Sequence, residues 1–127
     1  MKKHGILNPD LNAGLARLGH GDLVVIADCG LPLPLGAPIV DLALTMGVPD
    51  FAQVLDAVLG ELVVDSCVVA SECLGTKPDE WVRSRIGAVE SVPHEEFKLL
   101  TPRAKLIVRS GEATPYANVA LRCGVPF

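Results

Sequence analysis

The sequence predicts an α/β fold: one three-layer α/β/α domain covering residues 1–127, with helices on both faces of a mainly parallel mixed sheet. Short apolar runs, such as those at 23–27 and 62–70, are typical of strands buried on both faces. They alternate with segments in which apolar residues recur at helical spacing. The length of 127 residues fits one domain and leaves little room for a second.

The order of the elements follows from these patterns and from capping residues. Asn8 is a suitable N-cap for the first helix, Pro9 suits its first position, and Gly19 can end it with a positive φ. Asp50 and Gln53 form a capping-box pattern at the start of an amphipathic helix. We expect a helix at 8–18, a strand at 23–27, an apolar loop at 30–38, a strand within 39–44, a helix after 50, a strand at 62–70, helices at 76–86 and 95–100, and strands at 105–109 and 117–121.

The composition is apolar for a small protein, since half of the residues are hydrophobic and only 20% are charged. A small domain has much surface to cover with polar groups, so we expect part of the apolar surface to be buried between the subunits of an oligomer. A fully wrapped sheet without any partner is the alternative that composition leaves open.

Several classes of function lack support in the sequence. The formal net charge is −4 and Lys and Arg form no run, which argues against binding to nucleic acid or to an anionic membrane. No apolar run reaches the ~20 residues that span a bilayer. The basic start is followed by Asn8-Pro9-Asp10 and not by an apolar signal segment, so we expect a cytoplasmic protein. Motifs for nucleotide binding, serine hydrolysis and zinc hydrolysis are missing, and we expect neither a cofactor nor a metal.

The four cysteines form no CxxC pair and no zinc-type spacing, so we expect reduced thiols. Cys67 lies in a strand-like run and is expected to be a small core residue, because nothing in the sequence indicates an activated thiol. Cys29 is expected to pack beneath the loop that follows Asp28, and the sequence leaves open whether its thiol touches a ligand.

His20 is the first candidate for chemistry. It lies in Gly19-His20-Gly21-Asp22, just past the first predicted helix, where partial negative charge favours the protonated imidazolium. Such a group is a candidate general acid near neutral pH. Position alone, however, favours a solvated turn histidine.

Other polar residues lie at the ends of predicted strands. Asp28 ends an apolar strand, where α/β proteins bind ligands, although an Asp that caps loop amides fits equally well. The segment Arg109–Asn118 gathers several hydrogen-bonding residues in a loop between two strands, and by itself it also fits a structural turn. His94 precedes a short helix, where an ordinary capping-region residue is the alternative.

Together these residues belong to segments that resemble the D-ribose pyranase family of the ribose/fucose mutarotase superfamily. The segments are Met1-Lys2-Lys3 with Leu7-Asn8, Leu18-Gly19-His20, Ala27 to Pro32, Asp41 to Pro49, His94 to Phe97, Arg109 to Glu112, Pro115 to Asn118, and Gly124 to Phe127. The similarity covers nearly the whole chain and is least characteristic at 73–92. L-fucose mutarotases share the form of the Gly19–Asp22 segment, whereas Gly30–Pro32 and Pro115–Asn118 are more similar to the ribose branch.

The resemblance implies that the chain interconverts the pyranose and furanose forms of D-ribose without a cofactor. It implies a proton-donating histidine, which falls on His20. The implied sugar-binding positions are Asp28, His94, Tyr116, Ala117 through its backbone, and Asn118. The resemblance also implies a ring-shaped homo-oligomer of paired pentamers, with sites near subunit contacts.

Ring interconversion suits these residue types. The hemiacetal opens when a proton leaves the anomeric hydroxyl and another reaches the ring oxygen, and acid–base assistance typically accelerates such a step ~10²–10⁴-fold. On this hypothesis His20 donates to the ring oxygen, while Asp28 holds the sugar and orients the imidazole. The alternatives are L-fucose mutarotase activity, a non-catalytic sugar-binding accessory of an uptake system, and an assembly scaffold.

Overall fold

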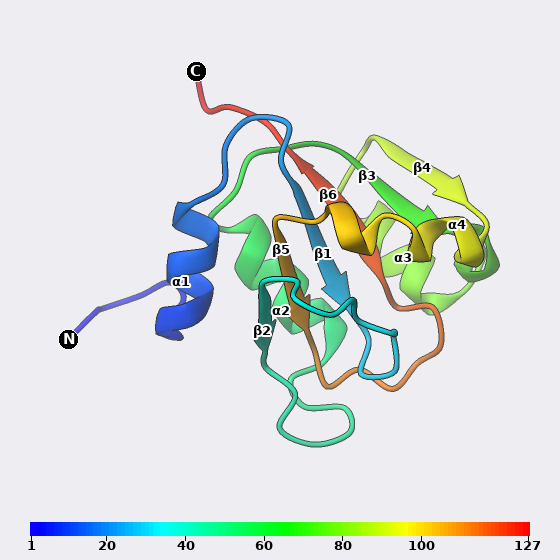
Figure 1. The fold of residues 1–127 in the computed structure, drawn as a ribbon, viewed down its shortest axis with the longest axis horizontal. Coiled ribbons are helices and arrows are strands. Elements are labelled where there is room, and N and C mark those ends of the chain that lie inside the picture. The colour runs from blue at the N-terminus through cyan, green and yellow to red at the C-terminus, as the bar shows by residue number, and fades with distance from the viewer.

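The computed structural model describes all residues 1–127 and contains one six-stranded sheet in the order β2-β5-β1-β6-β3-β4 (Figure 1). The elements are α1 (Pro9–Ala16), β1 (Leu23–Ala27), β2 (Ile39–Asp41), α2 (Phe51–Leu59), β3 (Val64–Ala70), α3 (Lys77–Arg83), β4 (Val89–Val92), α4 (His94–Lys98), β5 (Leu106–Arg109) and β6 (Val119–Cys123). The β1–β5, β2–β5 and β3–β4 pairs are parallel, whereas β6 is antiparallel to both β1 and β3. Five strands therefore point the same way, and the predicted mainly parallel mixed sheet is confirmed.

Helices cover both faces of this sheet, as the predicted three-layer arrangement requires. The larger core joins buried residues of α1, α2 and α3 to one face, with Leu11, Phe51 and Val82 as examples. The smaller core lies on the other face, where Phe97 of α4 packs with Val25 and neighbouring residues. Alternate residues of β1 face the two cores, so this strand is buried on both sides, which explains its continuous apolar run.

The predicted helix starts are confirmed, while several ends differ. The Asn8 side chain accepts a hydrogen bond from the Leu11 N–H, and Asp50 forms a capping box with Gln53. Helix α1 ends earlier than expected, with Arg17 as its C-cap, and Gly19 does not adopt a positive φ; that conformation occurs at Gly21 instead. The prediction that Gly19 ends the helix is therefore wrong.

The last strand is displaced from the expected 117–121 to Val119–Cys123. Ala117 is held in a turn by a hydrogen bond from its N–H to the Thr114 carbonyl, and the Asn118 side chain is bonded to Asp28. These contacts take both residues out of the strand ladder.

The direction of the strands decides where loops gather. Because five strands are parallel, the segments that follow β1, β2, β3, β4 and β5 all emerge at one edge of the sheet. The turn before β1 and the end of β6 lie at the opposite edge (Figure 1). No helix in the structure is both long enough and apolar enough to cross a membrane.

Candidate functional site

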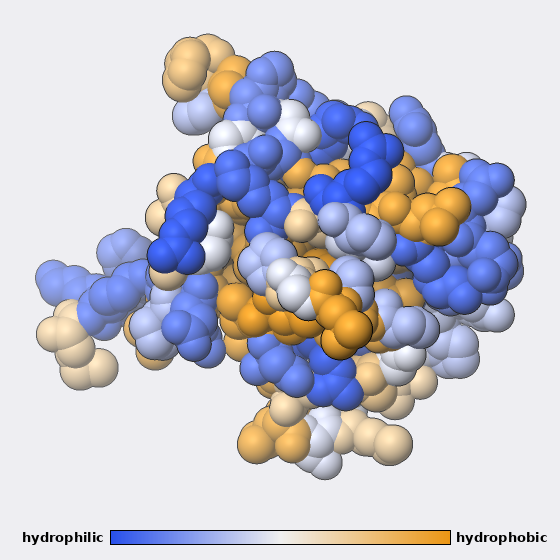
Figure 2. Space-filling view, viewed as in Figure 1, coloured by the Kyte–Doolittle hydropathy of each residue, from blue (hydrophilic) through white to orange (hydrophobic).

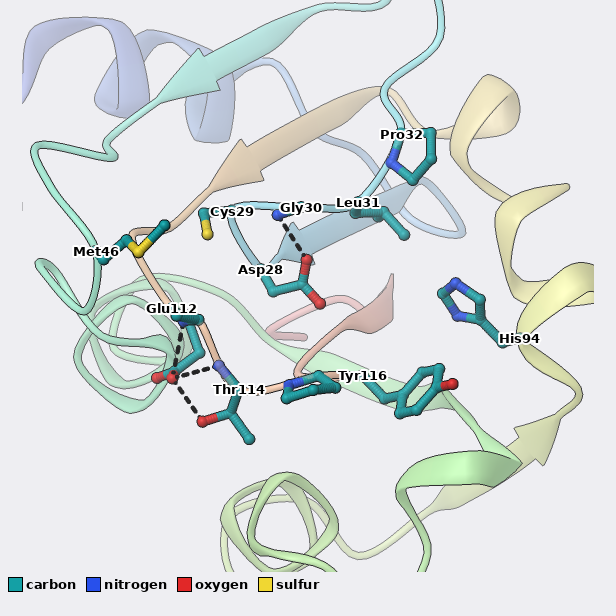
Figure 3. Close-up of a pocket in the computed structure, with 12 residues that line it drawn as sticks. Asp28, Cys29, Gly30, Leu31, Pro32, Met46, His94, Glu112, Thr114 and Tyr116 are labelled. Atoms are coloured by element: carbon teal, nitrogen blue, oxygen red, sulfur yellow. Dashed lines mark hydrogen bonds between the residues drawn. The ribbon is translucent and has the colours of Figure 1, made fainter.

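A pocket of about 410 Å³ lies at the edge where the five parallel strands end (Figure 3). This volume is within the ~300–1,000 Å³ typical of small-molecule sites. The pocket is lined by residues from the loops after β1, β2 and β5 and by the start of α4: Asp28, Cys29, Gly30, Leu31, Pro32, Met46, His94, Glu112, Ala113, Thr114, Pro115 and Tyr116. Its position agrees with the general rule that open α/β sheets bind ligands beyond the carboxyl ends of their strands.

Asp28 is nearly buried and is held in a fixed orientation. Its carboxylate accepts hydrogen bonds from the Gly30 N–H (2.9 Å) and from the Asn118 side-chain amide (2.8 Å), while the Asn118 carbonyl oxygen accepts from the Asp28 N–H (2.8 Å). A carboxylate has about four acceptor positions, so two remain for a ligand. Asp28 therefore caps a loop amide, and the same side chain lines the pocket.

Asn118 and Ala117 lie behind the pocket wall. They are 2% and 0% exposed, and neither lines the pocket. Asn118 therefore positions Asp28 through the reciprocal bonds described above.

His94 and Tyr116 form the opposite side of the pocket, with their rings edge to face and their centroids 5.1 Å apart. The buried Nδ1 of His94 has no hydrogen-bond partner, and its backbone N–H donates to the Glu72 carboxylate (2.9 Å). Tyr116 has a φ of +62°, a left-handed conformation that is unfavourable for a residue with a side chain. Figure 3 shows both rings beside the space into which Asp28 points.

Glu112 is a pocket residue that lies within the Arg109–Asn118 segment but to which the sequence assigned no role of its own. It is 8% exposed, and its carboxylate accepts four hydrogen bonds. The donors are the N–H groups of Phe51 (3.1 Å), Ala113 (3.1 Å) and Thr114 (3.0 Å), and the Thr114 hydroxyl (2.8 Å). Burial alone would raise the pKa of Glu112, but these bonds outweigh it, and the pKa lies below its ordinary value of 4.5.

The acid stability of the fold should depend on Glu112. Because its pKa is lower in the folded chain, the stabilisation it provides is complete above the ordinary value of 4.5 and is lost as the pH falls through the folded value. We expect Glu112→Gln to make the free energy of unfolding less dependent on pH in this acidic range. Denaturant titrations of both proteins at several pH values below 5 measure this, and parallel curves would contradict the assignment.

His20 lies outside the pocket, at the other edge of the sheet. It precedes β1, whereas Asp28 follows it, and a strand of five residues alone spans ~16 Å. Its side chain is 65% exposed, and its Nε2 lies 3.4 Å from an Asp65 carboxylate oxygen. Within this chain the carboxylate beside His20 is therefore that of Asp65 in β3 and not that of Asp28.

The turn that carries His20 is well anchored. The Asp22 carboxylate accepts from the Gly19 N–H (2.7 Å) and from the Lys105 ammonium (2.8 Å), and the Gly21 N–H donates to the Cys123 carbonyl (2.8 Å). The ion pair with Lys105 is the main reason why the pKa of Asp22 is lowered. His20 thus projects from a fixed backbone into solvent.

The cysteines are free, and burial separates them into two classes. Cys67, Cys73 and Cys123 are at most 3% exposed. Burial raises the pKa of Cys67 and of Cys73 to about 11 and also raises that of Cys123, so these thiols stay protonated at neutral pH. Cys29 is half-buried and lines the pocket. No group of three or more His, Cys, Asp or Glu side chains is placed to hold a metal ion.

Comparison with known proteins agrees with this architecture. The profile of the RbsD / FucU transport protein family matches residues 1–126. The chain belongs to this family. It is 53% identical over 127 residues to a D-ribose pyranase of Cutibacterium acnes, and the alignment covers 100% of both chains. It is also similar to the structure of Bacillus subtilis RbsD complexed with D-ribose, with a TM-score of 0.94, 44% identity and full coverage of both chains.

Similarity within the family is graded. The structure of a fucose mutarotase from Streptococcus pneumoniae in complex with L-fucose has a TM-score of 0.80 and 27% identity, over 99% of this chain and 100% of that one. Both the fold and the sequence are therefore more similar to the ribose-bound RbsD structure. The resemblance to the ribose branch inferred from the Gly30–Pro32 and Pro115–Asn118 segments is confirmed by this difference.

Proposed function

We propose that this chain is a D-ribose pyranase, an isomerase that interconverts the pyranose and furanose forms of ribose by opening and reclosing the sugar ring without a cofactor. The observation that carries the proposal is the pocket with its fixed Asp28 acceptor facing the His94 and Tyr116 rings. Support comes from the full-length similarity to proteins named D-ribose pyranase and to RbsD complexed with D-ribose.

The residues of the pocket suit a small polyol. Asp28 offers free acceptor positions to sugar hydroxyls, and the imidazole of His94 lines the same pocket. The Tyr116 hydroxyl both donates and accepts, and the ring gives an apolar face for the sugar carbons. We assign Asp28, His94 and Tyr116 to direct contact with ribose, Asn118 to holding Asp28, and Ala117 to the backbone of the same wall.

We propose that the proton donor, His20, reaches the pocket from a second subunit. His94 is the only imidazole that lines the pocket of one chain, whereas His20 is exposed at the far edge of the sheet. His20 reaches the pocket if the edge of the sheet that carries it meets the pocket edge of the next chain. Repeated head-to-tail contacts of this kind close into rings when the rotation permits.

Exposed apolar side chains support such an assembly. Leu44, Met46 and Val48 lie on the loop after β2, next to the pocket, and are 82%, 81% and 48% exposed. At the other edge Val125 and Phe127 are exposed, and Figure 2 shows apolar side chains both at the top, where the chain ends in Figure 1, and at the bottom, where the loop after β2 projects. We propose the ring-shaped homo-oligomer of paired pentamers implied by the family resemblance, and a cytoplasmic location, which suits four free cysteines.

Magnetisation exchange in NMR spectra of ribose tests the proposed activity. Adding the protein at catalytic concentration should raise the rate of exchange between pyranose and furanose signals above the buffer value, and it should do so more for D-ribose than for L-fucose. His4→Ala, which alters an exposed histidine outside the pocket, is the matched control and should keep the full rate. Ribose binding with exchange left at the buffer value would instead indicate a non-catalytic accessory.

Cys29 provides a second check on the position of the sugar. At pH 8 a soluble alkylating reagent should modify Cys29 first, because the other three thiols are buried and protonated. Saturating ribose should slow this modification, whereas an equal concentration of glycerol should not. Peptide mass spectrometry identifies the modified residue, and an alkylation rate unaffected by ribose would place the sugar elsewhere.

A further inference from the structure

Glu112 joins parts of the chain that are far apart in the sequence. One carboxylate oxygen accepts from the N–H of Phe51, the first residue of α2, and the other accepts from three donors of Ala113 and Thr114. Its carbonyl accepts from the Cys29 N–H (2.8 Å), so the same residue also touches the loop after β1. Glu112 therefore connects α2 with two of the loops that line the pocket.

The loop that Glu112 holds contains a strained residue. Thr114, bonded to Glu112 through both its N–H and its hydroxyl, accepts in turn from the Ala117 N–H across the Thr114–Ala117 turn (3.4 Å). Tyr116 lies inside this turn with its φ of +62°. A left-handed tyrosine persists only when the surrounding structure enforces it, because the conformation is unfavourable in itself.

All four partners of the Glu112 carboxylate are donors, so both terminal atoms of the side chain at this position must be acceptors. A carboxylate only accepts, whereas a glutamine amide of the same shape has one accepting oxygen and one donating NH₂ group. In either orientation that NH₂ group would face at least one N–H or O–H donor. The site therefore requires an ionised glutamate, and no other side chain of that length meets the need.

We infer that Glu112 is a positioning residue for the pocket, which holds the 112–117 loop against α2 and thereby keeps the Tyr116 ring in place opposite His94. The inference deepens the proposed function, on which its sugar-binding consequence rests. Loss of this anchor leaves the catalytic groups present but lets the Tyr116 side of the pocket move. Ribose affinity then falls, while the rate at saturating ribose changes much less.

Two NMR probes separate this role from general loss of stability. The chain has one tyrosine and one tryptophan, so the ring signals of Tyr116 and the indole N–H signal of Trp81 are each unique. Trp81 stacks on Phe51 in the larger core, with ring centroids 6.1 Å apart. In Glu112→Gln the Tyr116 signals should move toward random-coil positions as the ring leaves His94, while the Trp81 signal keeps its dispersed position.

Affinity and rate complete the test. We expect Glu112→Gln to bind ribose about 10-fold more weakly, equivalent to ~1.4 kcal/mol, with the exchange rate at saturation within about threefold of wild type. Thr114→Val, which removes one of the four bonds, should shift Tyr116 in the same direction by less. Unchanged Tyr116 signals in Glu112→Gln overturn the inference. If Glu112→Gln does not fold, wild-type Tyr116 signals in Thr114→Val overturn it. The Tyr116 signals are measured without sugar. They therefore test the role of Glu112 even if ribose is not the ligand.

Discussion

Replacing His20 by alanine is expected to lower the rate of ribose ring exchange at saturating sugar by ~10²–10⁴-fold, the usual contribution of a general acid. Ribose affinity should change much less, because Asp28, His94 and Tyr116 of the pocket remain to hold the sugar. The exposed His20 side chain contributes little packing, so the free energy of unfolding should also stay close to that of wild type. NMR exchange and calorimetric titration with ribose measure the two effects separately.

The His4→Ala protein serves as control for this variant, since it also removes an exposed histidine but at the N-terminal segment. Full activity in the His20→Ala protein would show that the proton comes from another group. His94 would then be the remaining imidazole, because it already lines the pocket with an unpartnered nitrogen.

Replacing Asp28 by alanine should reduce ribose affinity by ~100-fold or more, because each hydrogen bond to a charged group contributes ~1.5–3 kcal/mol. Part of the effect is local, since the Gly30 N–H and the Asn118 amide both lose their acceptor. We therefore also expect the free energy of unfolding to fall by ~1–3 kcal/mol, the cost of buried donors without partners. Calorimetry with ribose and denaturant titration check the two values.

Asp10→Asn is the matched control, because Asp10 lies in the first turn of α1 and is exposed. It should leave ribose affinity unchanged. An Asp28→Ala protein that binds ribose within a fewfold of wild type would show that the carboxylate only caps its loop, which is the structural interpretation of this residue.

The order of strands and helices could be predicted from the sequence, because the apolar pattern of each element reflects which of its faces are buried. The run 23–27 is apolar throughout since β1 contacts both cores, and Asp50 with Gln53 forms the capping box that its spacing predicts. The first residue of β6, Val119 and not Ala117, could not be predicted from the sequence. It depends on a bond between Asn118 and Asp28, which are 90 residues apart.

Long-range contacts also explain why the sequence assigned Glu112 no role of its own. In a Gly- and Pro-containing loop a glutamate normally faces solvent, and nothing nearby indicates burial. Its partner at the start of α2 lies 61 residues earlier in the chain. Asp28, His94 and Tyr116, in contrast, were singled out through family resemblance, and the fold brings all three to one pocket.

The distance between His20 and Asp28 within one chain could already be inferred from the sequence. Residues that flank one strand lie at its two ends, so a histidine before β1 and an aspartate after it belong to opposite edges of the sheet. A site that uses both must therefore be formed by two chains.

Mixed oligomers of two variant chains show whether one site is shared between two chains. His20→Ala chains keep the pocket and Asp28→Ala chains keep the donor, so co-expressed chains should form some interfaces with a complete site. With random assembly about a quarter of the sites combine an intact pocket with an intact His20. We predict NMR exchange of ribose at about that share of the wild-type rate at a ribose concentration near the wild-type Kd, where each variant alone is nearly inactive. Mixed oligomers, verified by native mass spectrometry, that exchange no faster than the two separate variants would contradict it.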